Sequence, residues 1–166
     1  MFESIEQWPI AAELRGSTWA YPFVNAAHIV GIALLFGAIV PLDLRLAGFW
    51  RGVPVAPLRR VLVPIAVLGL CLAITAGVLL FIAKAADYAA SALFQAKMVL
   101  VALALTNAAA LRLAPAWRAK EETAASIAGI WPRIAGIASM VLWFSAILLG
   151  RLVGYFKHYP GLTWAE

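Results

Sequence analysis

The sequence contains few charged residues and a single cysteine. Only 13% of its 166 residues are Asp, Glu, Lys or Arg, whereas an ordinary soluble domain carries roughly 25%. Because Cys71 is the single cysteine, an intrachain disulfide and a metal cluster built on cysteines are excluded. The apolar run around Cys71 favours a core position. Because 64% of the residues are apolar, water alone would not solvate this chain, and the composition predicts an integral membrane protein.

Several functional motifs are also missing. The chain has no glycine-rich phosphate loop, no nucleophile elbow and no HExxH or Cys-x-x-Cys sequence, which argues against nucleotide chemistry and hydrolysis. The first eight residues include two glutamates but no Lys or Arg, so we expect no cleaved secretory signal there. The net charge of +5 comes from basic residues between apolar blocks, which indicates membrane topology rather than a nucleic-acid partner.

Four apolar stretches are long enough to cross a bilayer, which takes about 20 helical residues. We predict an all-α fold, a four-helix transmembrane bundle that forms one domain over residues 1–166. The predicted spans are approximately 20–42, 61–83, 91–112 and 133–156. In the segment 2–14, Phe2, Ile5 and Trp8 follow helical spacing before Pro9, which predicts a short N-terminal helix on the membrane surface. Residues 118–130 are charged and then mildly amphipathic, which predicts a second surface helix.

Basic residues are distributed unevenly between the two sides of the predicted bundle. Eight lie in the connections 43–60 and 112–133, against four or five on the opposite side. The positive-inside rule therefore predicts a multi-pass protein of the bacterial inner membrane with both termini in the periplasm. The lipid bilayer is the partner that this pattern implies, and it leaves a homo-oligomer or a redox partner open.

Polar residues inside the predicted spans are the candidates for function, because placing them in lipid costs free energy. His28, Lys97 and Arg151 all fall about 7–10 Å inside the outer face, at a rise of ~1.5 Å per residue. Asn25 lies one helical turn before His28, on the same face. We predict that these four side chains form a polar pocket in the outer leaflet.

The chemistry expected of this pocket follows from its side chains. An imidazole in a membrane four-helix bundle is a common axial ligand of haem iron and also a ligand of copper, so His28 is the candidate metal ligand. Lys97 and Arg151 are candidates for binding haem propionates, and lipid contact is the alternative for both. For His28 the alternative is an interior side chain that is hydrogen-bonded within the bundle. Met98 and Met140 are weaker candidates as copper ligands.

Polar residues near the inner side favour structural roles. Arg45 follows Asp43 where the first span leaves the membrane, a place suited to phosphates or to an acidic partner. Asn107, deep in the third span, predicts an interhelical hydrogen bond. Small residues in the spans predict close approach of helix backbones, namely Gly31, Gly37, Gly69, Gly77, Gly150 and Gly154.

The chain resembles a set of small bacterial membrane families loosely over all four spans, at few specific positions. These positions are the stretch from His28 to Gly37, the Asp43-Leu-Arg45-Leu sequence, the Phe94-Gln-Ala-Lys97 sequence, Asn107 and the Gly150-Arg151 pair at the end of the last span. It is most similar to a four-helix inner-membrane family of unassigned function. It is distantly similar to copper-resistance proteins of the CopD type and to protoporphyrinogen oxidases of the HemJ type.

The two distant resemblances imply different cofactors. The HemJ-like pattern implies haem b, with His28 on the iron and Arg45 and Lys97 near the substrate or the propionates. The CopD-like pattern implies copper at His28. The further histidines of the HemJ pattern are missing here, and Asn107 occupies the region of one of them. This departure argues against porphyrinogen oxidation and against a haem with two histidine ligands from one chain.

The sequence leaves three functions open. The first is haem b binding for electron transfer or oxidoreduction at the outer leaflet. The second is copper transport, and the third is a cofactor-free accessory or assembly role in a membrane complex. Catalytic residues are not identified, and whether the chain is an enzyme stays open.

Overall fold

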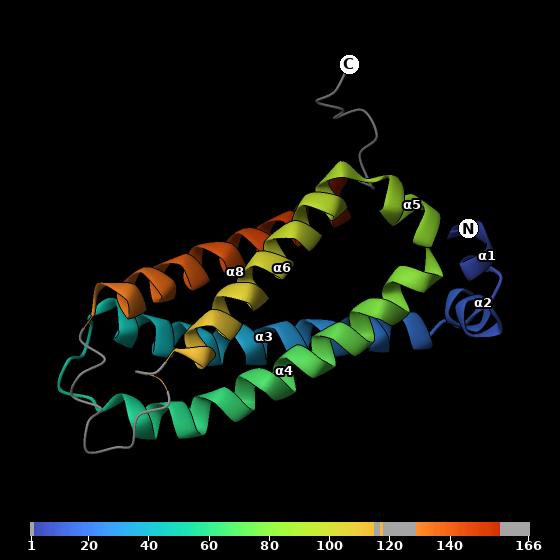
Figure 1. Cartoon of the computed structure of the whole chain (residues 1–166). Helices are drawn as coiled ribbons and strands as arrows, with labels where there is room; N and C mark the ends of the chain where they lie inside the picture. Colours follow the sequence, from blue (N-terminus) through green and yellow to red (C-terminus); the bar gives the residue numbers. More distant parts are fainter. Residues whose placement is uncertain (1, 115–116, 118–128, 157–166) are drawn as a thin grey trace.

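The computed structural model describes residues 2–114, 117 and 129–156, and within these ranges it contains helices and no strand. Four long helices dominate Figure 1, and each is long and apolar enough to cross a membrane. They confirm the predicted all-α four-helix fold of a multi-pass membrane protein. The helices in chain order are α1 (Phe2–Glu6), α2 (Pro9–Gly16), α3 (Ala20–Ala47), α4 (Val55–Ala83), α5 (Ala85–Ala90), α6 (Ala92–Leu113) and α8 (Ile130–Phe156).

The first long helix continues beyond its predicted end. Helix α3 passes through Pro41 and reaches Ala47, because Leu42 and Leu46 in this last part are buried against the other helices. It ends at Gly48, whose φ of 110° lies in the left-handed region that glycine adopts without a steric cost. The amides of Gly48 and Phe49 then donate to carbonyls of the last helical turn.

The N-terminal segment forms two short helices instead of the one that was predicted. Pro9 lacks an amide hydrogen and begins α2, which separates this helix from α1. Both helices are hydrogen-bonded to residues on either side of the turn between α4 and α5. Glu6 Oε1 accepts from the Ala86 amide at 2.8 Å, and Arg15 donates to the Ala83 carbonyl at 3.0 Å. The second predicted surface helix, at 118–130, falls almost entirely outside the described residues.

Helices α3 and α8 form the inner pair of the bundle. Helix α3 packs along both α4 and α8, and α6 packs along α8. The closest approach joins α3 and α4 at two glycines. A Cβ on Gly31 would lie 2.5 Å from the Ala73 nitrogen, and one on Gly69 would lie 2.5 Å from the Leu35 nitrogen. Backbone therefore touches backbone at this crossing, as small residues allow in membrane helices.

Two apolar clusters form the core, and each receives side chains from all four long helices. The middle cluster is centred on the buried residues Leu35, Ala104 and Trp143. The second cluster lies near the α3–α4 connection and contains Leu42, Leu46, Val55, Leu111, Trp117 and Ala135. Apolar side chains such as Val30, Leu103 and Val141 are exposed on the outside of the bundle, where a lipid bilayer would cover them.

The two ends of the bundle differ in composition. The α3–α4 connection lies at one end, and α1, α2 and α5 lie at the other (Figure 1). We call the first the basic end, because its described residues include Arg45, Arg51, Arg59, Arg60, Arg112 and Arg133. The half of the bundle next to α1, α2 and α5 is called the terminal half, and it contains His28 and Lys97.

Candidate functional site: the His28 and Lys97 region

His28 lies half-buried on α3 and contacts α4. Its Nδ1 atom is 2.7 Å from the backbone carbonyl oxygen of Ala73. A carbonyl oxygen only accepts hydrogen bonds, so Nδ1 carries the hydrogen in this contact when the ring is neutral. The lone pair of a neutral imidazole then lies on Nε2. Ligation of a metal through one ring nitrogen, with the other donating to a backbone carbonyl, is the usual arrangement of protein metal sites.

The close crossing of α3 and α4 explains why the Ala73 carbonyl reaches His28. Gly31 and Gly69 let the two backbones touch, which brings the buried Ala73 beside α3. Gly77 follows Ala73 by one turn of α4 and faces the imidazole. A Cβ on Gly77 would lie 3.0 Å from His28 Cε1, so glycine leaves the space that the ring occupies. The position of the ring therefore depends on three glycines.

Lys97 approaches the same region from α6 and lies half-buried. Ser91 begins α6, and its hydroxyl accepts a hydrogen bond from the Phe94 amide. The Lys97 side chain crosses to α8, where a Cβ on Gly150 would lie 3.4 Å from its Nζ atom. The ammonium group is also close enough to His28 for an electrostatic interaction. Both residues therefore belong to the same half of the bundle, and the predicted pocket stays a prediction.

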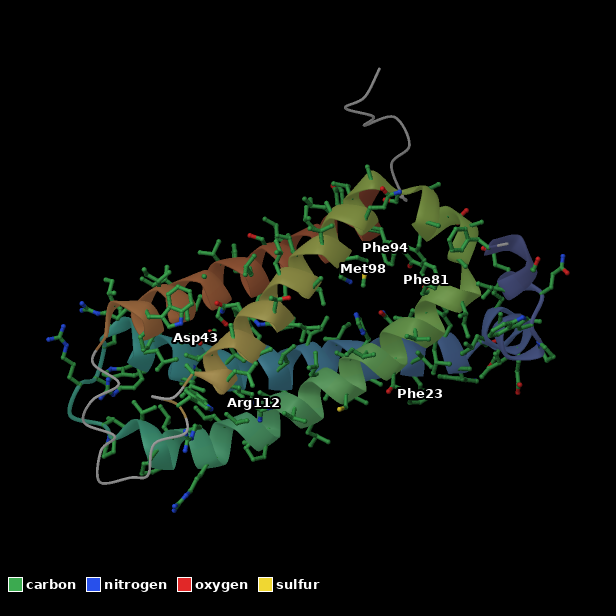
Figure 2. The ribbon with its side chains drawn as sticks, in the orientation of Figure 1. Phe23, Asp43, Phe81, Phe94, Met98 and Arg112 are labelled. Carbon is green, nitrogen blue, oxygen red and sulfur yellow. The ribbon has the colours of Figure 1, made fainter. Side chains whose placement is uncertain are left out.

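Aromatic side chains lie between this region and the terminal end of the bundle. Phe81 stacks on Phe94 at 5.5 Å between ring centroids, and Tyr88 lies 5.3 Å from Phe94 and 6.4 Å from Phe81. Figure 2 shows Phe81 and Phe94 approaching each other between α4 and α6. Burial, together with the neighbouring Tyr21, raises the pKa of Tyr88 to about 12. The Phe81 and Phe94 rings come from positions about one helical turn from Gly77 on α4 and from Lys97 on α6, toward the terminal end.

The other two residues of the predicted pocket lie apart from His28 and Lys97. The side chains of Asn25 and Arg151 are both exposed on the surface of the bundle. Asn25 precedes His28 by one turn, but the helix turns its side chain outward. Arg151 directly follows Gly150, so its backbone is near Lys97 while its side chain points elsewhere.

Arg45 lies at the basic end, far from His28. The two residues are separated along α3 by roughly 25 Å at a rise of ~1.5 Å per residue. The guanidinium donates to the Val53 carbonyl at 2.5 Å and to the Arg51 carbonyl at 3.2 Å, which closes the α3–α4 connection. Arg45 therefore fixes a helix end and does not join His28 and Lys97.

Polar side chains in the other half of the bundle connect helices. Asp43 is 4% exposed, and its carboxyl is hydrogen-bonded to Ser139 of α8. Figure 2 shows Asp43 where α3 and α8 lie side by side. Asn107 donates from Nδ2 to the Ala135 carbonyl at 2.9 Å, which confirms the predicted interhelical hydrogen bond.

The remaining sulfur and metal-binding candidates are dispersed. Cys71 is exposed, so its predicted core position was wrong: its face of α4 is turned away from the other helices. Met98 is 46% exposed, and Met140 is half-buried on α8. Within the described ranges, no three His, Cys, Asp or Glu side chains gather as a metal site would require. His158 lies outside the described residues.

Three components of the site were not assigned to it from the sequence. Ala73 acts through its backbone carbonyl, which no side-chain pattern reveals. Gly77 and Gly150 were predicted only to let helix backbones approach, and they leave space beside His28 and Lys97. The same prediction was wrong for Gly37 and Gly154, where no described atom lies within 4 Å of a Cβ position. Comparison with protein-family models, with curated proteins and with solved structures gave no match to this chain.

Proposed function

We propose that this chain binds one haem b in the terminal half of its bundle, with His28 as the protein ligand of the iron. The observation that carries this proposal is the 2.7 Å contact between His28 Nδ1 and the Ala73 carbonyl. This contact fixes the ring and directs the hydrogen to Nδ1, so the basic nitrogen is Nε2. A bound haem b would supply one-electron redox chemistry, and we propose electron transfer or oxidoreduction as the function.

Lys97 supports the choice of haem over a bare metal ion. Haem b carries two propionates, and a partly buried ammonium is a suitable partner for a carboxylate. Lys97 lies against Gly150 and within electrostatic range of His28, so one ligand that has both a metal and a carboxylate would use both residues. Arg151 adjoins Gly150, but its side chain is exposed on the surface of the bundle, so we assign no propionate to it.

The set of available ligands also favours haem. A porphyrin provides four ligands to its iron, so a protein completes the site with one or two. A metal ion without a porphyrin takes several protein ligands, and the described residues gather no such group around His28. A site that rests on one well-oriented histidine is therefore best suited to haem. A second axial ligand from a partner copy is compatible with this proposal.

We propose that the basic end faces the cytoplasm of a bacterial cell and that the His28 region lies in the outer leaflet of the inner membrane. The support is the concentration of arginine at the α3–α4 and α6–α8 connections. In this orientation both termini lie in the periplasm. A redox partner would then approach the terminal half from the periplasmic side or within the bilayer.

The proposal is tested by purifying the protein in mild detergent from haem-replete cells and recording oxidised and reduced absorption spectra. The chain should show a Soret band that is strongly reduced in His28→Ala. Thr106→Ala is the matched control, because this exposed hydroxyl only donates to the Ala102 carbonyl of its own helix. Its spectrum should equal that of the unchanged protein.

Three outcomes would overturn the proposal in whole or in part. A colourless protein that retains copper, and loses it in His28→Ala, would assign the site to copper transport. A colourless, metal-free protein that co-purifies with a larger membrane complex would assign an accessory role. A Soret band that persists in a well-folded His28→Ala protein would retain haem but exclude His28 as its ligand.

A further inference from the structure

Three arginines from different parts of the chain converge on the short connection between α3 and α4. Arg133 of α8 donates from Nε to the Ala47 carbonyl at 3.2 Å. Arg51 donates to the Gly48 carbonyl at 3.2 Å, and Arg45 donates to the carbonyls of Val53 and Arg51. Arg133 also lies over Gly48, where a Cβ would be 2.9 Å from its Nη2 atom. We call Arg45, Arg51 and Arg133 the arginine triad.

The triad brings positive charges together with only neutral partners. Each hydrogen bond that its members form with the described residues ends on a backbone carbonyl. A guanidinium has five N–H donors, so most donors of the triad are not used by these bonds. Repulsion between neighbouring cations is relieved when an anion binds between them. Guanidinium groups match the oxygens of a phosphate in particular.

Aromatic side chains beside the triad indicate where the anion comes from. Phe49 and Trp50, in the same connection, are 59% and 57% exposed. Trp50 has a φ of 47°, in the left-handed region that is unfavourable for a non-glycine residue. This conformation belongs to a turn that directs two large rings away from the protein. Exposed aromatic rings at the end of a membrane span are typical of the lipid headgroup region.

We propose that the arginine triad is a binding site for the phosphate of an anionic lipid headgroup. Phe49 and Trp50 would lie among the acyl chains and headgroups beside it, while the three guanidiniums bind the phosphate oxygens. The bound lipid connects α3 with α8, because Arg45 belongs to α3 and Arg133 belongs to α8. This site is at the opposite end from His28, and it does not depend on the proposed haem.

The test is the thermal unfolding midpoint of the full chain in detergent after addition of dioleoylphosphatidylglycerol or dioleoylphosphatidylcholine. Phosphatidylglycerol should raise the midpoint by about 5 °C more than phosphatidylcholine, because a ligand that binds the folded state stabilises it. The double variant R51Q/R133Q should lose most of this difference. R112Q is the matched control, since it removes an exposed arginine at the same end, outside the triad.

A third condition contains inorganic phosphate instead of added lipid. A small effect of inorganic phosphate supports a lipid site, whereas the full stabilisation would assign the site to free phosphate and overturn the proposal. An equal response of R51Q/R133Q and R112Q to phosphatidylglycerol would also overturn it. If R51Q/R133Q does not fold, R133K provides the comparison, because it keeps the charge but loses the guanidinium fork and should show a reduced response.

Discussion

The terminal half of this bundle and the half next to the basic end, here called the basic half, both contain polar side chains. The two sets differ in how many of their polar atoms are hydrogen-bonded within the protein. In the basic half, Asn107 donates to a carbonyl of α8, and Asp43 is hydrogen-bonded to Ser139. Both contacts connect one helix to another. In the terminal half, His28 uses one ring nitrogen for the Ala73 carbonyl, and the Lys97 side chain lies against Gly150 of the neighbouring helix α8.

The comparison shows how a structural polar residue differs from a candidate ligand. A side chain that only connects helices uses its polar atoms within the protein. His28 instead keeps a basic nitrogen beyond its one structural hydrogen bond, in a region where glycines leave space. Asp43 is the intermediate case, because its Oδ2 atom is buried without a partner among the described residues. If the two halves are independent, a substitution in the basic half should change stability without changing haem binding.

The largest effect is expected from Gly69→Val, which should destabilise the whole bundle. A Cβ at this position would lie 2.5 Å from the Leu35 nitrogen and 2.7 Å from the Gly31 carbonyl oxygen, so α3 and α4 must separate. Overpacking of this kind costs about 3 kcal/mol or more. Thermal unfolding in detergent measures the loss. Gly37→Val on α3 is the control, because no described atom lies within 4 Å of its Cβ position.

The second prediction concerns the basic half alone. Ser139→Ala removes the hydrogen bond to a carboxyl group that is already incompletely paired, which should cost about 1–3 kcal/mol. Haem binding should be unchanged, because Ser139 lies in the other half of the bundle. Unfolding and haem titration of the same preparation measure the two quantities. A parallel loss of haem at full stability would contradict the separation of the halves.

A third variant acts on the terminal half alone. Gly77→Ala places a methyl group about 3.0 Å from His28 Cε1, so the ring must shift. Haem affinity should fall about tenfold, in the range seen when the groups that orient a ligand are altered. The unfolding midpoint should change little. Affinity equal to that of the unchanged chain would show that Gly77 does not position the ring.

The smallest effect is expected from alkaline pH acting on Tyr88, which lies beside Phe81 and Phe94. Because the pKa of Tyr88 is raised from 10.0 to about 12 in the folded chain, the folded state retains this proton more tightly than the unfolded state. The resulting stabilisation is fully present below pH 10 and is lost as the pH rises toward 12. Tyr88→Phe should weaken the pH dependence of unfolding in this window, and an unchanged profile would argue against the contribution of Tyr88.

The sequence predicted the fold well because lipid simplifies the physical problem. Apolar stretches of about 20 residues give the positions of the spans, since a backbone in lipid must satisfy its own hydrogen bonds. The predicted end of the first span was too early, because α3 continues to Ala47. The burial of Leu42 and Leu46 carries α3 past Pro41, which local sequence rules do not include. Pro9 begins α2 and separates it from α1, whereas the prediction placed one short helix in the segment 2–14.

The candidate site was predicted in part, because depth along a helix is easier to infer than direction. Counting residues put His28, Lys97 and Arg151 at similar depths, and helical spacing put Asn25 on the face of His28. In the structure His28 and Lys97 are half-buried, whereas Asn25 and Arg151 are exposed. The direction of each side chain depends on how each helix is rotated in the bundle, and packing sets that rotation. The Gly31 and Gly69 crossing turns His28 toward Ala73 and leaves Asn25 exposed.

The most direct test of the central proposal is titration of the haem-free protein with haem, using His28→Gly with and without added imidazole. We expect a saturable Soret band at one haem per chain for the unchanged protein, weak binding by His28→Gly, and recovery when free imidazole occupies the position of the missing ring. Equal haem binding by both proteins without imidazole, or no binding by either, would contradict the assignment of His28 as the haem ligand.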